Sequence, residues 1–88
     1  MASVTFGRSR ECDFVIDDFY ISRSHCRLQM HPIKPGPGEQ GRYRFTLIDS
    51  GSPAGTLVNS KRVEHPVDLR TGDSLQIGSV RLAFRILG

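Results

Sequence analysis

The sequence lacks an apolar run long enough to cross a membrane. No stretch approaches the roughly 20 consecutive apolar residues that a membrane-spanning helix needs, and the N-terminal residues lack the apolar segment of a signal peptide. Hydrophobic residues make up 38% of the chain and charged residues 24%, as in ordinary globular proteins. We therefore expect a soluble domain that does not associate with a membrane and is located in the cytoplasm.

Cysteine is scarce as well. Cys12 and Cys26 are the only two, which is too few for a disulfide framework, and neither belongs to a C-x-x-C pair. The nearby His25 and His31 do not complete a spacing typical of a zinc site. Cys26 falls in an apolar alternation, which predicts a small core residue. We expect no disulfide bridge, no metal and no cofactor.

Lysine is rare among the basic residues. Only Lys34 and Lys61 of the 12 basic residues are lysines, the others are arginines, and the net charge is +3. The planar guanidinium group binds phosphate or carboxylate with two parallel hydrogen bonds, which a lysine cannot do. Because GC-rich coding also increases arginine content, the composition alone leaves an anionic ligand and a coding bias equally open.

Sustained helical periodicity is missing too, and short alternating runs take its place, which is typical of an all-β protein. The chain of 88 residues is long enough for one domain with a small core. We expect the alternating apolar residues to face one core between two antiparallel sheets. They are Val4 and Phe6; Phe14 and Ile16; Cys26, Leu28 and Met30; Tyr43, Phe45 and Leu47; Leu75 and Ile77; and Val80, Leu82, Phe84 and Ile86.

The segment "HPIKPGPGEQG" (residues 31–41) is rich in proline and glycine. Proline cannot donate a hydrogen bond to a neighbouring strand, so such a segment is not expected inside a sheet. We interpret it as a surface loop between two strands.

Three loops are unusual for their polar residues: "FGRSRE", "YISRSH" and "DSGSPAGTLVN". Connections at one end of a β-sandwich lie close together. If these three loops cluster, Arg8, Ser22 and Arg23 can converge on a single anion. Two guanidinium groups and a hydroxyl fit a phosphate monoester, because charge-assisted hydrogen bonds are the strong ones.

The order of these motifs along the chain resembles the forkhead-associated (FHA) domain family. The elements are G-R, then D-F-V-I-D-D, I-S-R-S-H, D-S-G-S-P-A-G-T-L-V-N and T-G-D-S-L-Q-I-G. The resemblance covers nearly the whole chain, from Phe6 to Ile86. The resemblance implies an all-β sandwich of two twisted antiparallel sheets, whose loops at one end bind phosphothreonine peptides.

Transferred onto matching positions, the resemblance implies that Arg8 contacts the phosphate and Ser22 hydrogen-bonds it, with Arg23 as a further phosphate or peptide contact. A second group of residues would shape the binding loops. Ser60, which follows Asn59, stands where the family usually has a glycine. The residues of the group are Gly7, His25, Gly55, Thr56 and Asn59.

One position departs from the family pattern. Ala54, preceded by Pro53, stands where the family usually has the asparagine of an Asn-Gly pair. That asparagine normally hydrogen-bonds the ligand's main chain beside the phosphothreonine, and its loss costs about 0.5–1.5 kcal/mol. The alternative function is therefore an FHA fold that assembles with other proteins without reading phosphate.

The family usually has sheet before its G-R motif, and here little chain precedes Gly7. We expect residues 1–88 to be a single domain excised from a larger protein, with Met1 and Ala2 contributed by a vector.

Other functions fit the sequence less well. A hydrolase built from Ser22 or Ser24 with His25 and Asp49 would need Ser24 and His25 on one face, yet neighbours on a strand point to opposite faces, and no G-x-S-x-G motif is present. Nucleic-acid binding ranks third, because the aromatic residues mostly alternate inward. We predict a non-enzymatic module that recognises phosphothreonine on a partner protein, downstream of a Ser/Thr kinase.

Overall fold

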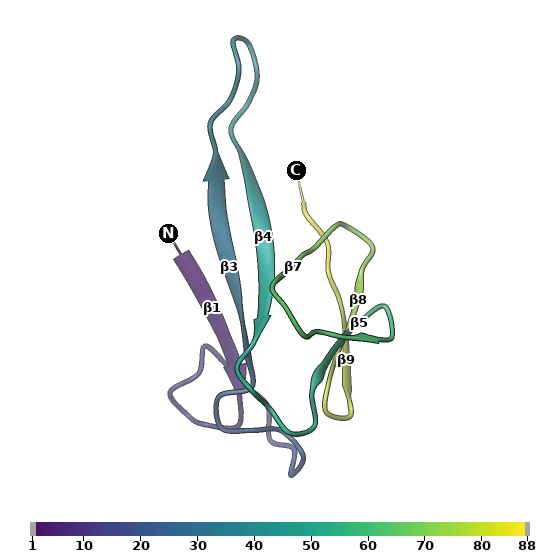
Figure 1. Cartoon of the computed structure of the whole chain (residues 1–88). Helices are drawn as coiled ribbons and strands as arrows, with labels where there is room; N and C mark the ends of the chain where they lie inside the picture. The colour runs from purple at the N-terminus through teal and green to yellow at the C-terminus, as the bar shows by residue number, and fades with distance from the viewer. Residues whose placement is uncertain (1, 88) are drawn as a thin grey trace.

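The computed structural model describes residues 2–87, so the expectation about Met1 lies outside the described residues. Within them the chain forms nine strands. The strands make two sheets that face each other (Figure 1). The sandwich predicted from the sequence is confirmed. The first sheet has the order β2-β1-β3-β4-β7, made of β1 (Ala2–Gly7), β2 (Phe14–Val15), β3 (Cys26–Ile33), β4 (Arg42–Asp49) and β7 (Val67–Asp68). The second has the order β6-β5-β8-β9, made of β6 (Lys61–Arg62), β5 (Thr56–Val58), β8 (Ser74–Ile77) and β9 (Val80–Ala83).

One strand pair departs from the antiparallel expectation. β2 runs parallel to β1, with Phe6 opposite Phe14. The chain leaves β1, forms a loop over residues 8–13 and returns beside the same strand. Asp13 anchors the return, because its Oδ2 accepts hydrogen bonds from the Thr5 N–H (2.8 Å) and the Thr5 hydroxyl (3.0 Å). The loop with Arg8 therefore projects from the end of the sheet.

The core lies between the two sheets and contains residues of both. Leu47 of β4 and Ile77 of β8 are completely buried. The alternation of apolar residues along the sequence predicted several of the core residues. It did not predict those in the irregular segments between short strands, where side chains do not alternate between two faces. The buried apolar residues are Phe6, Ile21, Cys26, Leu47, Val58, Val63, Leu69, Leu75 and Ile77.

Three residues expected to face the core are exposed instead. Phe14 is on the two-residue edge strand β2, where its ring stacks on Phe6 with centroids 5.1 Å apart. Tyr43 lies on the part of β4 beyond the core, and Ile86 follows the end of β9. At each of these positions the alternation of apolar residues lies outside the part of the sandwich where the two sheets cover each other.

The proline-rich segment is partly a strand, which corrects the loop prediction. β3 continues through Ile33, with Pro32 opposite Tyr43, so that only residues 34–41 form the loop. Among residues 2–87, β1 pairs with β3 as far as Met30, and Pro32 is paired with β4 alone. A proline is tolerated there because the missing N–H can face an open edge. This hairpin extends beyond the body of the molecule in Figure 1.

The loops that carry the polar motifs lie at the other end of the molecule. The β1–β2, β2–β3 and β4–β5 connections gather at the bottom of Figure 1. Hydrogen bonds join the other two connections to the β2–β3 loop: the Arg8 N–H donates to Ser22 O, and His25 Nε2 pairs with Gly55 O. Among residues 2–87, no helix is long and apolar enough to cross a membrane.

Candidate functional site

Two loops meet where Arg8 follows β1. The Arg8 N–H donates to Ser22 O (3.0 Å), and the Ser9 N–H donates to Arg23 O (3.1 Å). This approach requires glycine at position 7, because a Cβ atom there would lie 2.2 Å from Arg23 O. Gly7 is not among the residues with positive φ, so the close contact with Arg23 is what demands glycine here.

The joined loops form a surface pocket of about 480 Å³ rich in arginine. Arg8, Arg10 and Arg23 line it together with Ser9 and one acidic residue, Glu11. Neither of the two ion pairs found within residues 2–87 involves these arginines. The pocket therefore combines three guanidinium groups with a single carboxylate, an electrostatic environment that suits a multiply charged anion.

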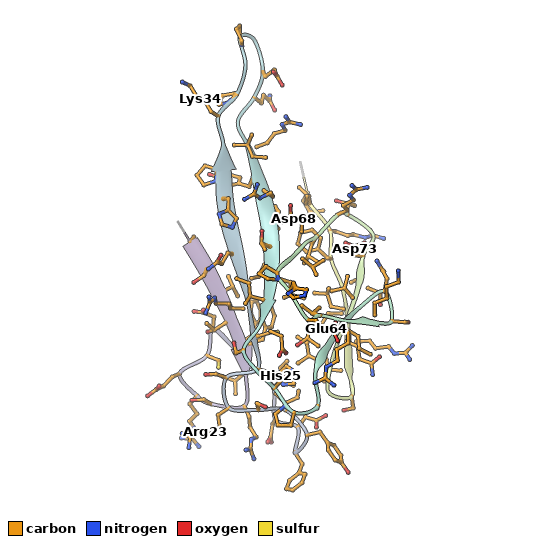
Figure 2. The ribbon with its side chains drawn as sticks, viewed as in Figure 1. Arg23, His25, Lys34, Glu64, Asp68 and Asp73 are labelled. Atoms are coloured by element: carbon orange, nitrogen blue, oxygen red, sulfur yellow. The ribbon has the colours of Figure 1, made fainter. Side chains whose placement is uncertain are left out.

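The structure brings Arg8 and Arg23 into one pocket, whereas Ser22 is not among the residues that line it. Ser22 is half-buried and contributes its backbone to the loop: its carbonyl accepts from Arg8 and its N–H donates to His25 Nδ1 (3.2 Å). Within residues 2–87 the Ser22 hydroxyl has no hydrogen-bond partner. Figure 2 shows Arg23 near the lower end of the molecule and Lys34 near the upper end, on the long hairpin.

His25 is completely buried between the loops. Its Nδ1 accepts the Ser22 N–H, so Nδ1 carries no proton, and Nε2–H donates to the carbonyl of Gly55 (2.8 Å). The neutral Nε2–H tautomer is therefore the one that satisfies both contacts. Through this ring the loop after β2 is attached to the loop before β5.

Asp49, the last residue of β4, organises the loop that precedes β5. Its Oδ1 accepts from the hydroxyls of Ser52 (2.6 Å) and Thr56 (2.8 Å), and its Oδ2 accepts from the N–H groups of Gly51 (2.9 Å) and Ser52 (3.1 Å). Partial burial opposes ionisation, but these four hydrogen bonds outweigh it and lower the pKa of the carboxyl group. We did not predict this role, although an Asp two residues before a glycine is typical of an Asx turn.

The turn before β5 contains the departure from the family pattern. Gly55 has a φ of 81°, a left-handed conformation that favours glycine, and Thr56 after it is fully buried. Ala54 is exposed on this turn. The Arg62 guanidinium lies against the same turn, with Nη2 3.5 Å from Ser52 O.

Asn59 lies with a different set of residues. It forms the β5–β6 turn with Ser60, at φ values of 50° and 70°. Its Nδ2 donates to Asp73 (2.9 Å), and its Oδ1 accepts from the Ser74 N–H (3.0 Å). These bonds attach the turn to the start of β8, so Asn59 supports the second sheet.

The motif order and this geometry agree with a comparison to known families. A model of the FHA domain matches residues 4–78. The chain belongs to the FHA domain family.

Proteins similar to this FHA domain include bacterial regulators. An oxoglutarate dehydrogenase inhibitor of Corynebacterium efficiens is 38% identical over 82 residues, which are 93% of this chain and 50% of that protein. The glycogen accumulation regulator GarA of Mycobacterium tuberculosis is 34% identical over 83 residues, 94% of this chain and 44% of that protein. The chain thus spans about half the length of these curated relatives.

A solved structure supports the same assignment. The yeast Dun1 FHA domain, in complex with a doubly phosphorylated peptide derived from Rad53, superposes with a TM-score of 0.80 at 29% identity. The alignment covers 94% of this chain and 58% of the other. That neighbour binds a phosphothreonine peptide.

Among the described residues, His25 and Asp49 do not form the Ser–His–Asp arrangement of a hydrolase. His25 Nδ1 is occupied by the Ser22 N–H, and Asp49 binds Ser52 and Thr56 rather than His25. A hydrolase would need a base within reach of its nucleophile and a third group that orients the base. The relatives named above are likewise an inhibitor and a regulator.

The cysteines are both free. Cys12 Sγ donates to Arg23 O (3.2 Å) beneath the arginine pocket, whereas burial raises the pKa of Cys26 to about 11, which makes it an unreactive core thiol. Among residues 2–87 no group of three His, Cys, Asp or Glu side chains is placed to hold a metal ion.

Proposed function

We propose that this FHA domain recognises phosphothreonine on a partner protein. The observation that carries the proposal is the pocket formed by Arg8, Arg10 and Arg23 on two loops whose backbones are hydrogen-bonded to each other. A phosphoryl group brings a charge of about −1.5 to −2 and three strong acceptor oxygens. In the proposed complex the Arg8 and Arg23 guanidinium groups bind these oxygens, and the Ser22 hydroxyl donates a further hydrogen bond.

The surrounding residues hold this pocket in a binding-ready shape. His25 fixes the loop of Ser22 and Arg23 to Gly55. Gly7 allows the β1–β2 loop to approach Arg23. Asp49 orders the loop before β5. Thr56 supports that order as a buried donor to Asp49. Preorganisation of this kind favours affinity because less freedom is lost on binding.

A reader of phosphothreonine implies a Ser/Thr kinase upstream and a location in the cytoplasm, where such kinases act on proteins. We also propose that residues 1–88 are one domain of a longer protein, since the relatives are about twice as long as the matched region. Their names, an inhibitor of a dehydrogenase and a regulator of glycogen accumulation, make a metabolic enzyme a reasonable class of partner to test.

The test is isothermal titration calorimetry with one degenerate peptide library, prepared with phosphothreonine and with unmodified threonine at its fixed position. The proposal expects heat of binding for the phosphorylated library alone. Equal binding of both, or of neither, would overturn it.

The second candidate is phosphate-independent assembly with another protein, which Ala54 favours because its methyl group cannot hydrogen-bond a peptide main chain. Equal affinity for both libraries is the result that this candidate expects. Binding that ignores phosphopeptide and weakens steeply with salt would instead indicate a nucleic acid.

A further inference from the structure

A groove of about 920 Å³ lies between the first half of β4 and the C-terminal segment. β4 contributes Tyr43 and Phe45 to it, and the C-terminal segment contributes Ile86 and Leu87. Tyr43, Ile86 and Leu87 are exposed. The C-terminal segment lies beside the upper part of β4 in Figure 1, away from the loops of the arginine pocket. This β4 groove therefore presents apolar side chains to solvent at the other end of the molecule.

The outer edge of β4 is open beside the groove. Within residues 2–87, β7 pairs with β4 only at Thr46 and Leu47. Beyond them, the carbonyl of Phe45 accepts a hydrogen bond from the Leu69 N–H (2.8 Å). Backbone groups of an antiparallel strand alternate in direction, so the N–H and carbonyl of Tyr43 point to the same edge as the Phe45 carbonyl. An edge that no other strand covers can accept an added strand.

Side chains along this edge alternate in chemistry. Tyr43 and Phe45 face the groove. Because successive residues of a strand point to opposite faces, Arg42 and Arg44 belong to the outer face of the sheet, although Arg42 also reaches the groove. An added strand would therefore meet an apolar surface on one of its faces and arginines on the other.

The charge at the edge is positive. Arg85 of the C-terminal segment adds a third guanidinium group to the two of β4. Two carboxylates face the arginines of β4, with Glu39 4.0 Å from Arg42 and Asp68 3.8 Å from Arg44. Both ion pairs join exposed side chains at long distance, and such pairs contribute little free energy. Carboxylates of a partner can therefore approach these arginines.

β7 shows which kind of sequence this edge accepts. Val67, opposite Leu47, packs against the core. Asp68, opposite Thr46, accepts the Thr46 hydroxyl through Oδ1 (2.8 Å), and its Oδ2 lies 3.8 Å from Arg44 Nε. The chain's own strand at this edge is thus an apolar residue followed by an acidic one. A strand placed further along β4 would meet the same two kinds of surface.

We propose that the open edge of β4 at Arg42–Arg44 binds an extended segment of a partner protein in which apolar and acidic residues alternate. The segment adds a short strand to the first sheet. Its backbone pairs with Tyr43, its apolar side chains enter the β4 groove, and its carboxylates face Arg42 and Arg44. Opposite charges on neighbouring strands form a favourable cross-strand pair. Because Arg23 lies at the other end of the molecule (Figure 2), this inference does not depend on the recognition of phosphothreonine.

The test measures the binding of three fluorescein-labelled peptides by fluorescence anisotropy. In the first, valine and aspartate alternate; the second has lysine in place of every aspartate. The third has the composition of the first, with its valines and its aspartates in separate blocks. We expect the first peptide to bind about tenfold tighter than either of the others, because it alone offers apolar and acidic side chains on opposite faces.

An Arg42→Glu, Arg44→Glu double variant reverses the charge of the edge. We expect it to lose affinity for the aspartate peptide and to gain affinity for the lysine peptide, which a merely weakened fold would not produce. The matched control is Arg27→Glu, Arg81→Glu, because these arginines are exposed on β3 and β9, outside the groove. The control has the same net charge and should keep the native preference. Melting temperatures show whether each variant is folded.

Ile86→Ser tests the groove separately from the arginines. Ile86 is exposed, so its replacement should leave the fold intact. The variant removes apolar surface from the groove and should weaken the aspartate peptide about threefold to tenfold, since binding buries part of that surface. This measurement decides the question if the charge-reversed variant does not fold.

Several results would overturn the inference. Equal affinity of the alternating and blocked peptides would indicate attraction between charges alone. A native preference that survives the charge reversal, or an aspartate peptide that binds Ile86→Ser as tightly as the native chain, would exclude this edge. Self-association of the native chain in analytical ultracentrifugation, with no binding of any peptide, would assign the edge to a second copy. Loss of the preference on charge reversal supports the inference whether or not phosphothreonine peptides bind.

Discussion

His25 Nε2 lies 2.8 Å from the carbonyl oxygen of Gly55, 30 positions later in the chain. The same imidazole accepts the Ser22 N–H, so one ring connects the loop behind the arginine pocket to the turn that begins the second sheet. Both partners are backbone groups, which means that the ring positions the loops rather than particular side chains.

His25→Ala should therefore lower stability strongly. Two buried hydrogen bonds and a fully buried ring are lost, for a cost of about 2–4 kcal/mol. For a domain of this size that is a fall in melting temperature of at least about 8 °C by differential scanning calorimetry. His65→Ala, at an exposed position, is the control and should leave the melting temperature unchanged. A similar melting temperature for His25→Ala and the native chain would show that the ring does not hold the loops together.

Arg8→Ala should separate binding from folding. Its side chain is exposed and makes no ion pair within residues 2–87, so the melting temperature should stay within about 2 °C of the native value. Loss of a charged hydrogen-bond donor should weaken phosphopeptide binding about 10- to 150-fold in calorimetry. The control is Arg81→Ala, because Arg81 is an exposed arginine on β9, outside the pocket. This variant loses the same charge and should bind phosphopeptide as the native chain does. A large drop in stability of Arg8→Ala would mean that this arginine is structural.

Gly7→Ala should damage the pocket through the backbone. The added methyl group would meet Arg23 O at 2.2 Å, so the two loops must separate and the hydrogen bonds of Arg8 and Ser9 weaken. We expect lower affinity for phosphopeptide together with a destabilisation of about 1–3 kcal/mol in urea unfolding. Gly41→Ala is the control, because nothing lies within 4 Å of the added atom. If both variants behave alike, the close approach of the loops is not required.

Asp49 should contribute to stability in a pH-dependent way. Its hydrogen bonds outweigh partial burial and hold its pKa below the ordinary value of 3.8. A group whose pKa is depressed in the folded state stabilises the fold above its unfolded pKa, and this stabilisation is lost as pH falls through the folded pKa. We therefore expect Asp49→Asn to be less stable than the native chain near neutral pH, by about 1–3 kcal/mol for the lost hydrogen bonds. The difference should shrink below about pH 4.

Urea unfolding of both proteins at a series of pH values measures this effect. Asp17→Asn, at an exposed position without a hydrogen bond among residues 2–87, is the matched control and should be as stable as the native chain near neutral pH. A gap between Asp49→Asn and the native chain that stays constant into acid would contradict the role assigned to the ionised carboxylate.

Ala54→Asn should strengthen binding. It restores the hydrogen-bonding side chain that the family usually has on this exposed turn, worth about 0.5–1.5 kcal/mol or roughly 2- to 13-fold in affinity for a phosphothreonine peptide. Ala54→Leu, of comparable size but without polar atoms, controls for added bulk. Should both variants bind like the native chain, the absence of asparagine is not what limits affinity.

Local sequence patterns determined the class of fold and much of the site. The alternation in β1, β3, β4 and β8 is visible because successive residues of a strand face opposite sides, so apolar residues every second position indicate one buried face. The motif order placed Arg8 and Arg23 in loops, and the structure brings both into one pocket.

Tertiary structure alone decided the rest, because it depends on contacts between residues far apart in the chain. Ile21, Val63 and Leu69 lie outside the strands, so no alternation in the sequence predicts their burial. They are buried because they pack into the core of the sandwich. Gly7 needs its lack of a side chain because of a carbonyl 16 residues away, and Pro32 belongs to a strand through its pairing with Tyr43 of β4. The sequence by itself determined where apolar residues alternate along strands and which side chains can bind an anion. Packing of the two sheets decided which of these residues are buried, which loops are hydrogen-bonded to each other and which side chains stay exposed.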